Sequence, residues 1–336
     1  MTEVLVTASF PADLLARINA VSDTLAVSQL DLAKRPWPEG RMTTAEILYS
    51  YGAAMLPPLQ LAPNLRWVQF HSAGIDSVLD SEIWHSDILL TSASGIHAPN
   101  MGQYVMAQIL AWANRIPSWL YYQQRGEWPK DRWDKFLPDE LRGRTLGILG
   151  YGSVGREVAR LAKAFGMIVL ASKRDARDVK DHGYNVPGAG DPDGLTADRI
   201  YPGAATRSMV AECDYVVITL PLTPATRALV DEELLRAMKP SALLVNVGRG
   251  GVVDEAALIK ALKKGWIAGA GLDVFASEPL PADSPLWSLD NVLISPHVSG
   301  FTPHYDDRVV DLFCANLACY IAGQPLVNLV DRQAGY

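Results

Sequence analysis

The sequence is poor in cysteine, in long apolar runs and in excess positive charge. Its three cysteines, Cys213, Cys314 and Cys319, have no metal-ligand spacing, so no metal site is predicted, and their odd number excludes a closed set of disulfides. A reducing, cytoplasmic compartment is therefore expected. No uninterrupted apolar run reaches about 18 residues, and Glu3 precedes any basic residue. Neither a membrane-spanning helix nor a signal peptide is expected.

The balance of charges narrows the class of partner. The formal net charge is −7, so the chain lacks the basic field that binds nucleic acid. We expect a small-molecule partner, and neither nucleic acid nor a membrane. The apolar fraction of 49% and the charged fraction of 20% are typical of globular proteins and exclude a disordered chain. The length of 336 residues predicts two domains.

Short apolar runs alternate with helical patterns along the chain, which predicts βαβ units and parallel sheets. In the first third, strands are expected over 3–7, 47–50, 67–70 and 88–91. A second series is expected over 145–149, 167–171, 215–220, 243–247, 268–274 and 292–297. The second series forms the predicted nucleotide-binding domain.

Helix ends are recognisable in the second series. Apolar residues recur at helical spacing from Val154 to Phe165, and Gly166 supplies the stop. Asp254 can cap a further helix, which Gly265 ends.

Three other segments have distinct patterns. Residues 305–322 repeat apolar side chains at helical spacing, which predicts an amphipathic helix that packs back on the first domain and makes it discontinuous. Residues 119–141 are rich in aromatics without a clean period, which predicts a connecting arm. Residues 188–194, GAGDPDG, predict a surface loop.

A glycine-rich loop stands at the start of the second series. Gly150, Gly152 and Gly155 form a G-x-G-x-x-G pattern that follows an apolar strand and opens an apolar-striped helix. The N–H groups and the dipole at the start of such a helix favour a pyrophosphate. The alternative is a plain strand-to-helix turn, because tight turns also collect glycine.

The residues after the next strand bear on the choice of nucleotide. Lys173 stands 18 residues after Gly155, where NAD-binding units carry an acidic residue that binds the adenosine ribose. Lys173 and Arg174 would instead attract a 2′-phosphate, with Ser172 as an additional donor, so NADP is favoured over NAD. The alternative is that both basic residues are solvated and Asp175 binds the ribose of NAD.

Three ionisable residues follow neighbouring strands of the second series. Arg249, Glu278 and His297 are separated by 29 and 19 residues, and the carboxyl edge of one sheet can gather them. Arg249 can hold the carboxylate of a 2-oxo acid through a bidentate fork. His297 can donate a proton to the developing alkoxide, and Glu278 can fix the imidazole tautomer and favour the imidazolium. Each residue by itself also fits a structural role in a turn.

The order and spacing of several motifs resemble those of the D-isomer-specific 2-hydroxyacid dehydrogenases. The motifs are the glycine loop, TLPLTPATR, LVNVGRGGVVDE, IAGAGLDVFASEPLP and NVLISPHVSG. The resemblance covers the nucleotide domain closely and the flanking segments loosely. It implies a catalytic set of Arg249, Glu278 and His297, and a homodimer with a hinged substrate domain.

The resemblance also extends the cofactor site. It implies that Asp273 holds the nicotinamide carboxamide and that Pro221 and Leu222 line the cofactor cleft. Many relatives carry Arg-Ile in the glycine loop where this chain has Ser153 and Val154, so one charged contact to the pyrophosphate is expected to be absent. The predicted cofactor residues are Gly150, Gly152, Ser153, Val154, Gly155, Ser172, Lys173, Arg174, Pro221, Leu222, Val247, Asp273 and Gly300.

The motif HSAGID resembles the turn in this family whose backbone N–H groups receive the substrate carboxylate. Gly74 would allow close approach, and the amides of Ala73, Gly74 and Ile75 can form an anion nest. Together with Arg249 and His297, these residues form the predicted substrate site. The alternative is an ordinary strand-to-helix turn.

The predicted fold class is α/β, with a Rossmann-type doubly wound parallel sheet and a smaller, flavodoxin-like substrate domain that is discontinuous in sequence. The predicted domains are residues 1–115 with 299–336 for the substrate, and 116–298 for the dinucleotide. The expected activity is the NAD(P)-dependent reduction of small 2-oxo acids, of the glyoxylate or hydroxypyruvate type, to D-2-hydroxy acids. A phosphoglycerate dehydrogenase-like enzyme and a nucleotide-sensing corepressor of the same fold are the alternatives.

Overall fold

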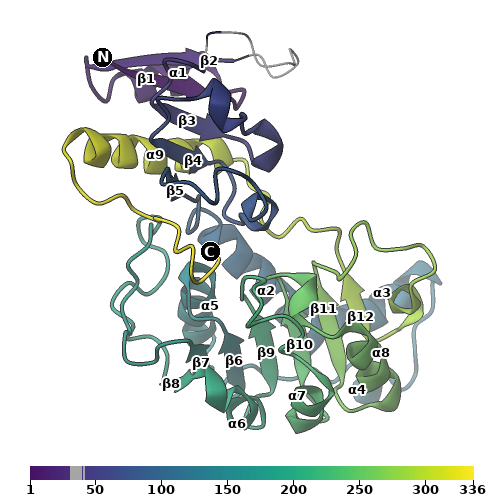
Figure 1. The fold of residues 1–336 in the computed structure, drawn as a ribbon. Helices are drawn as coiled ribbons and strands as arrows, with labels where there is room; N and C mark the ends of the chain where they lie inside the picture. The colour runs from purple at the N-terminus through teal and green to yellow at the C-terminus, as the bar shows by residue number, and fades with distance from the viewer. Residues whose placement is uncertain (31–39, 41) are drawn as a thin grey trace. The chain divides into compact units, whose positions relative to one another are not determined.

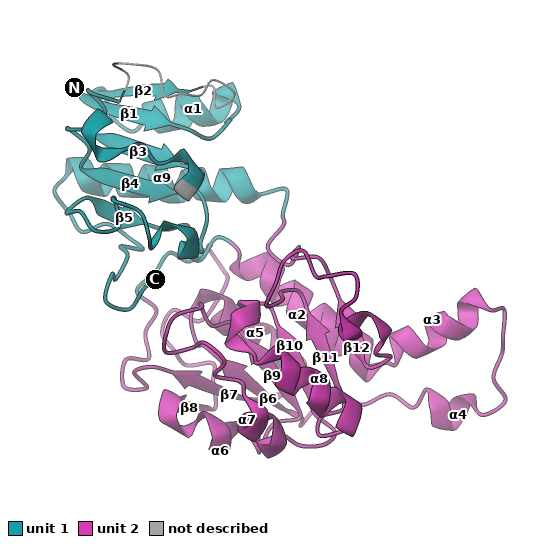
Figure 2. Ribbon diagram, turned by 45° about the vertical axis from the view of Figure 1, so that its right-hand side comes forward, with its two compact units in different colours: residues 1–96, 182–186, 302–336 teal, residues 97–181, 187–301 magenta. Residues whose placement is uncertain are grey.

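The computed structural model describes residues 1–30, 40 and 42–336, which form two compact units. The first unit contains residues 1–96, 182–186 and 302–336, and the second contains 97–181 and 187–301 (Figure 1 and Figure 2). These limits differ from the predicted domain boundaries, because residues 97–115 and 299–301 group with the second unit and residues 182–186 group with the first.

A five-stranded parallel sheet is the centre of the first unit. Its strands are β1 (Thr2–Val6), β2 (Leu25–Gln29), β3 (Ile47–Ser50), β4 (Trp67–Phe70) and β5 (Leu89–Thr91). Their order, β2-β1-β3-β4-β5, is that of flavodoxin-like folds, which confirms the predicted fold class of this unit. The edge strand β2 was missed because only Leu25 of its five residues is buried.

Helices α1 (Ala12–Asn19) and α9 (Tyr305–Ile321) belong to the first unit. Val310 and Phe313 of α9 join Val4 of β1 in one buried cluster. The predicted C-terminal helix is therefore confirmed. So is the discontinuity of this unit, because the far end of the chain completes the core of the N-terminal sheet.

A seven-stranded parallel sheet is the centre of the second unit. Its strands are β6 (Thr145–Leu149), β7 (Ile168–Lys173), β8 (Arg199–Pro202), β9 (Tyr215–Ile218), β10 (Leu243–Asn246), β11 (Gly269–Leu272) and β12 (Val292–Ile294). The order β8-β7-β6-β9-β10-β11-β12 is the Rossmann order with one strand added, which confirms the predicted doubly wound sheet. The edge strand β8 was missed because only Tyr201 is buried in it.

The helices of the second unit include both helices whose ends were predicted. They are α2 (Ala98–Ala113), α3 (Ile116–Gln124), α4 (Arg132–Lys135), α5 (Ser153–Ala164), α6 (Thr206–Val210), α7 (Glu232–Ala237) and α8 (Glu255–Lys264). The Asp254 carboxylate accepts a hydrogen bond from the Ala257 N–H at 3.0 Å, and Gly265 ends α8 with a φ of +67°. Among the described helices, none is long and apolar enough to cross a membrane.

The predicted connecting arm contains two helices, α3 and α4, that extend away from the seven-stranded sheet within the second unit (Figure 2). Large apolar side chains remain exposed on it. The exposed fraction is 83% for Trp128 and 74% for Trp133, and Tyr121 and Leu137 are exposed as well. The arm therefore presents apolar surface that nothing in the described part of this chain covers.

The segment 188–194 corrects one expectation. It is a loop, as predicted, but it does not lie wholly on the surface, because Gly190 and Asp191 are buried. Asp191 is only 6% exposed and accepts a hydrogen bond from the Tyr151 hydroxyl at 2.7 Å. This burial depends on Tyr151 of the glycine loop, which is distant in the sequence, so no pattern within residues 188–194 reveals it.

Candidate functional site

Four loops of the second unit meet at the carboxyl edge of its sheet. They follow β6, β10, β11 and β12, and all strands of the sheet run parallel. The strand order reverses between β6 and β9, which is where open α/β sheets bind ligands. The topology therefore brings the glycine loop and the predicted catalytic residues to one edge of one sheet.

The three glycines of the loop are required for three different reasons. Gly150 has a φ of +101°, which side-chain-bearing residues rarely adopt. A Cβ atom on Gly155 would lie 2.3 Å from the Gly150 carbonyl oxygen, so only glycine lets the helix approach the strand. A Cβ on Gly152 would meet no atom within 4 Å, so this residue faces open space. The loop leaves room for a ligand at Gly152 alone.

The start of α5 is suited to an anion. Gly152 is the N-cap residue and has no side chain, so no side chain caps the first-turn N–H groups, which include those of Ser153 and Val154. The helix dipole adds a partial positive charge at this end. Open space above an uncapped helix start fits the pyrophosphate of a dinucleotide.

The end of β7 carries the three residues predicted to select the nucleotide. Ser172 is buried, with 5% of its surface exposed. The Lys173 ammonium contacts the carbonyl oxygens of Asp178 and Lys180, the latter at 3.3 Å. Arg174 is exposed. Lys173 is thus engaged by the loop that follows it, which the sequence did not reveal.

Two loops flank the glycine loop on the side of β9 and β10. Pro221 and Leu222 follow β9 and are half-buried, and the Thr226 hydroxyl donates to the Pro221 carbonyl at 2.6 Å. Val247 follows β10 and is buried, with its N–H bonded to the Ile218 carbonyl at 3.2 Å. All three positions lie at the carboxyl edge, and their contact with a cofactor stays a prediction.

His297 and Glu278 are brought together by the ends of β11 and β12. The Nδ1 atom of His297 lies 2.7 Å from Oε2 of Glu278. The other carboxylate oxygen of Glu278 accepts the Phe275 N–H at 3.0 Å, which fixes the orientation of the carboxylate. A carboxylate at Nδ1 leaves Nε2 as the ring nitrogen that is available to a substrate.

Asp273 organises the loop that carries His297. Its side chain is fully buried and accepts hydrogen bonds from the Ser295 hydroxyl at 2.6 Å and from the N–H groups of Val298 and Ser299, both at 2.9 Å. Its own carbonyl accepts the His297 N–H at 2.9 Å. His297 has a φ of +54°, an uncommon conformation for a residue with a side chain. The predicted contact of Asp273 with a carboxamide remains a prediction.

Arg249 stands at the end of the strand next to that of Glu278. It follows β10, while Glu278 follows β11, and the Arg249 guanidinium donates to the Gly248 carbonyl at 2.9 Å. The loop is packed tightly, because a Cβ on Gly250 would lie 1.9 Å from the Phe275 carbonyl oxygen. Arg249 thus shares the carboxyl edge with Glu278 and His297.

Two sets of predicted residues lie outside this group. The carbonyl oxygen of Gly300 lies 3.1 Å from the Nδ1 atom of His97. The turn of Ala73, Gly74 and Ile75 follows β4 and belongs to the first unit. Within the described residues, the amides of this turn donate to no protein acceptor, as an anion nest requires.

Residues that were not predicted from the sequence support the site. Ser295 bonds both Asp273 and the Tyr104 hydroxyl, and Gln108 donates to that same hydroxyl at 2.8 Å. Tyr104 and Gln108 come from α2, far away in the sequence, and no local pattern marks them. In the described ranges, no group of His, Cys, Asp and Glu side chains is arranged to hold a metal ion.

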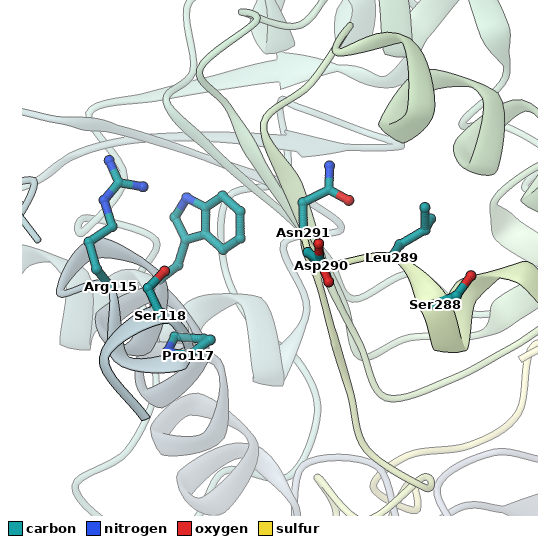
Figure 3. Close-up of a pocket in the computed structure, with 8 residues that line it drawn as sticks. Arg115, Pro117, Ser118, Ser288, Leu289, Asp290 and Asn291 are labelled. Atoms are coloured by element: carbon teal, nitrogen blue, oxygen red, sulfur yellow. The ribbon is translucent and has the colours of Figure 1, made fainter. Parts of the chain in front are cut away.

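A cavity of about 370 Å³ lies at the other edge of the same sheet (Figure 3). Its lining includes Trp112 of α2, Arg115 at the start of α3, and Asp290 and Asn291 from the loop before β12. These last residues precede the strand whose carboxyl end leads to His297. The cavity is therefore separate from the candidate site of Arg249, Glu278 and His297.

The chain is similar to a known protein family and to characterised sequences. A family model described as D-isomer specific 2-hydroxyacid dehydrogenase, NAD binding domain, matches residues 106–299. The glyoxylate reductase of Korarchaeum cryptofilum is 36% identical over 276 residues, which cover 82% of this chain and 78% of that protein.

Solved structures share the fold over the whole chain. The D-isomer specific 2-hydroxyacid dehydrogenase of Xanthobacter autotrophicus Py2, in complex with NADPH and MES, is 30% identical with a TM-score of 0.80 and covers 100% of this chain and 99% of its own. The NADPH-dependent glyoxylate/hydroxypyruvate reductase of Sinorhizobium meliloti, in complex with NADP and sulfate, is 26% identical with a TM-score of 0.79 and covers 100% of both chains.

Two glycine substitutions should separate nucleotide binding from folding. Gly152→Ala adds a methyl group in open space at an ordinary φ of −90°, so the protein should fold normally. The methyl group would obstruct the pyrophosphate and raise the Kd for NADPH, measured by calorimetry, at least about tenfold. Gly155→Ala should instead lower the melting temperature, because its Cβ collides with the Gly150 carbonyl. Unchanged NADPH binding by Gly152→Ala would contradict the assignment of the loop.

Proposed function

Because this chain belongs to the D-isomer specific 2-hydroxyacid dehydrogenase family, we propose that it reduces small 2-oxo acids of the glyoxylate and hydroxypyruvate type to D-2-hydroxy acids with NADPH. The observation that carries the proposal is the 2.7 Å hydrogen bond between His297 and Glu278, at the sheet edge that also bears the glycine loop. The second unit is then the dinucleotide-binding domain and the first is the substrate domain.

The residues at this edge divide the reaction between them. Bound nicotinamide supplies the hydride that reduces the carbonyl carbon. His297 donates the proton to the carbonyl oxygen as the alkoxide develops, and Glu278 stabilises the protonated ring through Nδ1. After the transfer, the ring is neutral and takes up a proton from solvent, for which its half-exposed position is suited.

Arg249 is proposed to hold the acid group of the substrate. A planar guanidinium binds a carboxylate through two parallel hydrogen bonds, and its charge draws electrons towards the carbonyl oxygen. The unpartnered amides of Ala73, Gly74 and Ile75 in the first unit are proposed as a second set of donors to the same carboxylate. Both contacts select 2-oxo acids over simple aldehydes.

Activity with glyoxylate or hydroxypyruvate tests the role of the acid. His297→Ala should lower kcat by about two to four orders of magnitude while the Kd for NADPH is nearly kept, because the ring donates the proton. Glu278→Gln should lower kcat but retain part of the activity, because the amide keeps a hydrogen-bond acceptor at Nδ1 while the imidazolium loses its negative partner. Stopped-flow kinetics from pH 5 to pH 9 or so measures both. Near-normal turnover by His297→Ala would contradict this mechanism. A wild type that turns over no 2-oxo acid would favour the alternative function, a nucleotide-sensing corepressor of the same fold.

Arg249→Lys tests the carboxylate contact. The substitution keeps the positive charge but loses the planar fork, so kcat/KM for 2-oxo acids should fall at least about tenfold, or about 1.4 kcal/mol. Simple aldehydes serve as the control substrates, because they have no carboxylate to lose. Equal losses for the two substrate types would show that Arg249 only supports its own turn.

NADPH is proposed as the nucleotide because β7 ends in two basic residues. The position after the strand that usually carries an acidic residue holds Lys173, and Arg174 follows. Both side chains are proposed to contact the 2′-phosphate: Arg174 is exposed, and Lys173 is held beside it by its contacts with the carbonyl oxygens of Asp178 and Lys180. The complexes of two structural neighbours with NADPH and NADP support this choice.

The choice of nucleotide is testable at Arg174. Wild type should show a higher kcat/KM with NADPH than with NADH, and added salt should shrink the advantage because the contact is exposed. Arg174→Ser should lower kcat/KM for NADPH at least about tenfold and leave that for NADH nearly unchanged. Asp175→Ala is the matched control and should leave both nearly unchanged. Preference of the wild type for NADH, with a loss in Asp175→Ala, would mean that Asp175 binds the ribose.

A homodimer is proposed as the working assembly. The arm of α3 and α4 exposes Trp119, Tyr121, Trp128 and Trp133, a concentration of aromatic surface that isolated chains rarely leave in water. A two-fold axis would bury the same patch on both copies. Sedimentation of the purified protein reports the assembly directly, as twice the chain mass of 36.6 kDa.

The reducing cytoplasm is proposed as its location. Cys213, Cys314 and Cys319 are all free thiols. Burial raises the pKa of the Cys213 thiol to about 12, so this residue stays protonated and unreactive inside the second unit. Thiols in this state persist where disulfides are kept reduced.

A further inference from the structure

Residues 174–198 form a long connection, here called the strap, between the neighbouring parallel strands β7 and β8. The strap leaves the second unit after Asp181, runs through the first unit over residues 182–186 and returns at Pro187 (Figure 2). The chain therefore passes between the units at residues 181/182 and 186/187, in addition to residues 96/97 and 301/302.

The base of the strap is held by one buried arginine. Arg156, in the first turn of α5, is 1% exposed and donates to the Val179 carbonyl at 2.7 Å and to the Asp191 carbonyl at 2.6 Å. These carbonyls belong to the outgoing and the returning limb. A hydrogen bond of 2.9 Å from the Asp181 N–H to the Pro192 carbonyl closes the two limbs on each other.

The base is also bonded to the glycine loop. Tyr151, between Gly150 and Gly152, donates its hydroxyl to the Asp191 carboxylate at 2.7 Å, and the Arg156 guanidinium lies 4.6 Å from the centre of its ring. Burial raises the pKa of the Tyr151 hydroxyl far above its usual value, so it remains a donor. Tyr151, which lies in the loop proposed to bind the pyrophosphate, is thus hydrogen-bonded directly to the strap.

Asp191 is ionised and can hold this bond. Burial acts to raise the pKa of its carboxyl, but hydrogen bonds from Tyr151, Thr196 and Leu195 outweigh burial and lower it. The Leu195 and Thr196 N–H groups lie 2.9 and 3.0 Å from the carboxylate oxygens. Because the folded-state pKa lies below the unfolded one, this stabilisation is present at neutral pH and is lost as the pH falls through the folded value.

The tip of the strap is anchored beside a crossing of the chain. The Tyr184 N–H donates to the Asn328 side-chain oxygen at 2.9 Å, and the Asn328 amide donates to the carbonyls of Ser92 and Ser94 at 3.1 and 2.8 Å. The Tyr184 carbonyl packs so closely on Gly95 that a Cβ there would lie 1.9 Å away. Gly95 has a φ of +95° and precedes the crossing at residues 96/97 by one residue.

We propose that the strap couples the two binding sites, so that nucleotide at the glycine loop and a 2-oxo acid anion held by the first unit raise each other's affinity through it. The proposal rests on the proposed function. A nucleotide restrains Tyr151, and through Asp191 it orders the base of the strap; the tip then restrains the backbone at Gly95, where the chain passes between the units. Ordering shared by two ligands lowers the cost of binding the second one, and the effect is reciprocal.

The test compares the Kd for NADPH without and with saturating oxamate, an unreactive analogue of a 2-oxo acid. Wild type should bind NADPH at least about fivefold more tightly in the presence of oxamate. Replacing residues 182–186 by a Gly-Ser-Gly-Ser-Gly segment of the same length keeps the base but removes the anchor. This variant should lose the coupling and keep its Kd for NADPH alone within about threefold of the wild-type value.

Leu195→Ser is the matched control on the strap. Leu195 is 82% exposed, so the substitution changes the same loop without touching the anchor, and the coupling should stay at the wild-type value. Undiminished coupling in the 182–186 replacement would overturn the proposal, as would a wild type in which oxamate leaves the Kd for NADPH unchanged. A wild type that binds no NADPH at all would overturn the proposed function as well.

Two smaller changes keep the test valid if the replacement does not fold. Asn328→Gly removes the anchor oxygen at a residue whose φ is +58°, a conformation that glycine adopts without strain. Tyr151→Phe removes only the hydroxyl at the base. Each should reduce the coupling at least about twofold, and wild-type coupling in both would overturn the proposal.

Discussion

The buried carboxylate of Asp273 is the constraint around which the candidate site is built. A fully buried charge costs several kcal/mol unless donors surround it, and here three donors come from the single loop of Ser295, Val298 and Ser299. The loop must therefore wrap around Asp273. That path holds His297 in its uncommon conformation and points it at Glu278.

Helix α5 combines an uncapped start with the buried side chain of Arg156. The outward-facing N–H groups at its start stay uncapped and suit a pyrophosphate, whereas Arg156 and Glu157, one turn in, face the strap. Both side chains are almost fully buried, and both bond to strap backbone. The first turns of α5 therefore present a candidate anion site on one side and anchor the strap on the other.

The regular parts of the fold were predictable because burial imposes local patterns. Strands buried on both faces appear as short apolar runs, and the ends of α5 and α8 carry glycines with positive φ. Strands β2 and β8 were missed because they lie at sheet edges, where few side chains are buried. Helix α3 was missed for a similar reason, since none of its residues is buried.

For the candidate site, the order of residues along the chain was enough to identify the available chemical groups and the strand ends that carry them. Arg249, Glu278 and His297 follow three consecutive strands, and parallel topology alone assembles them at one edge. The contacts of each group became evident from the folded chain. The bonding of Lys173 to its own loop and the burial of Asp191 both depend on partners brought near by folding, whose positions no local spacing encodes.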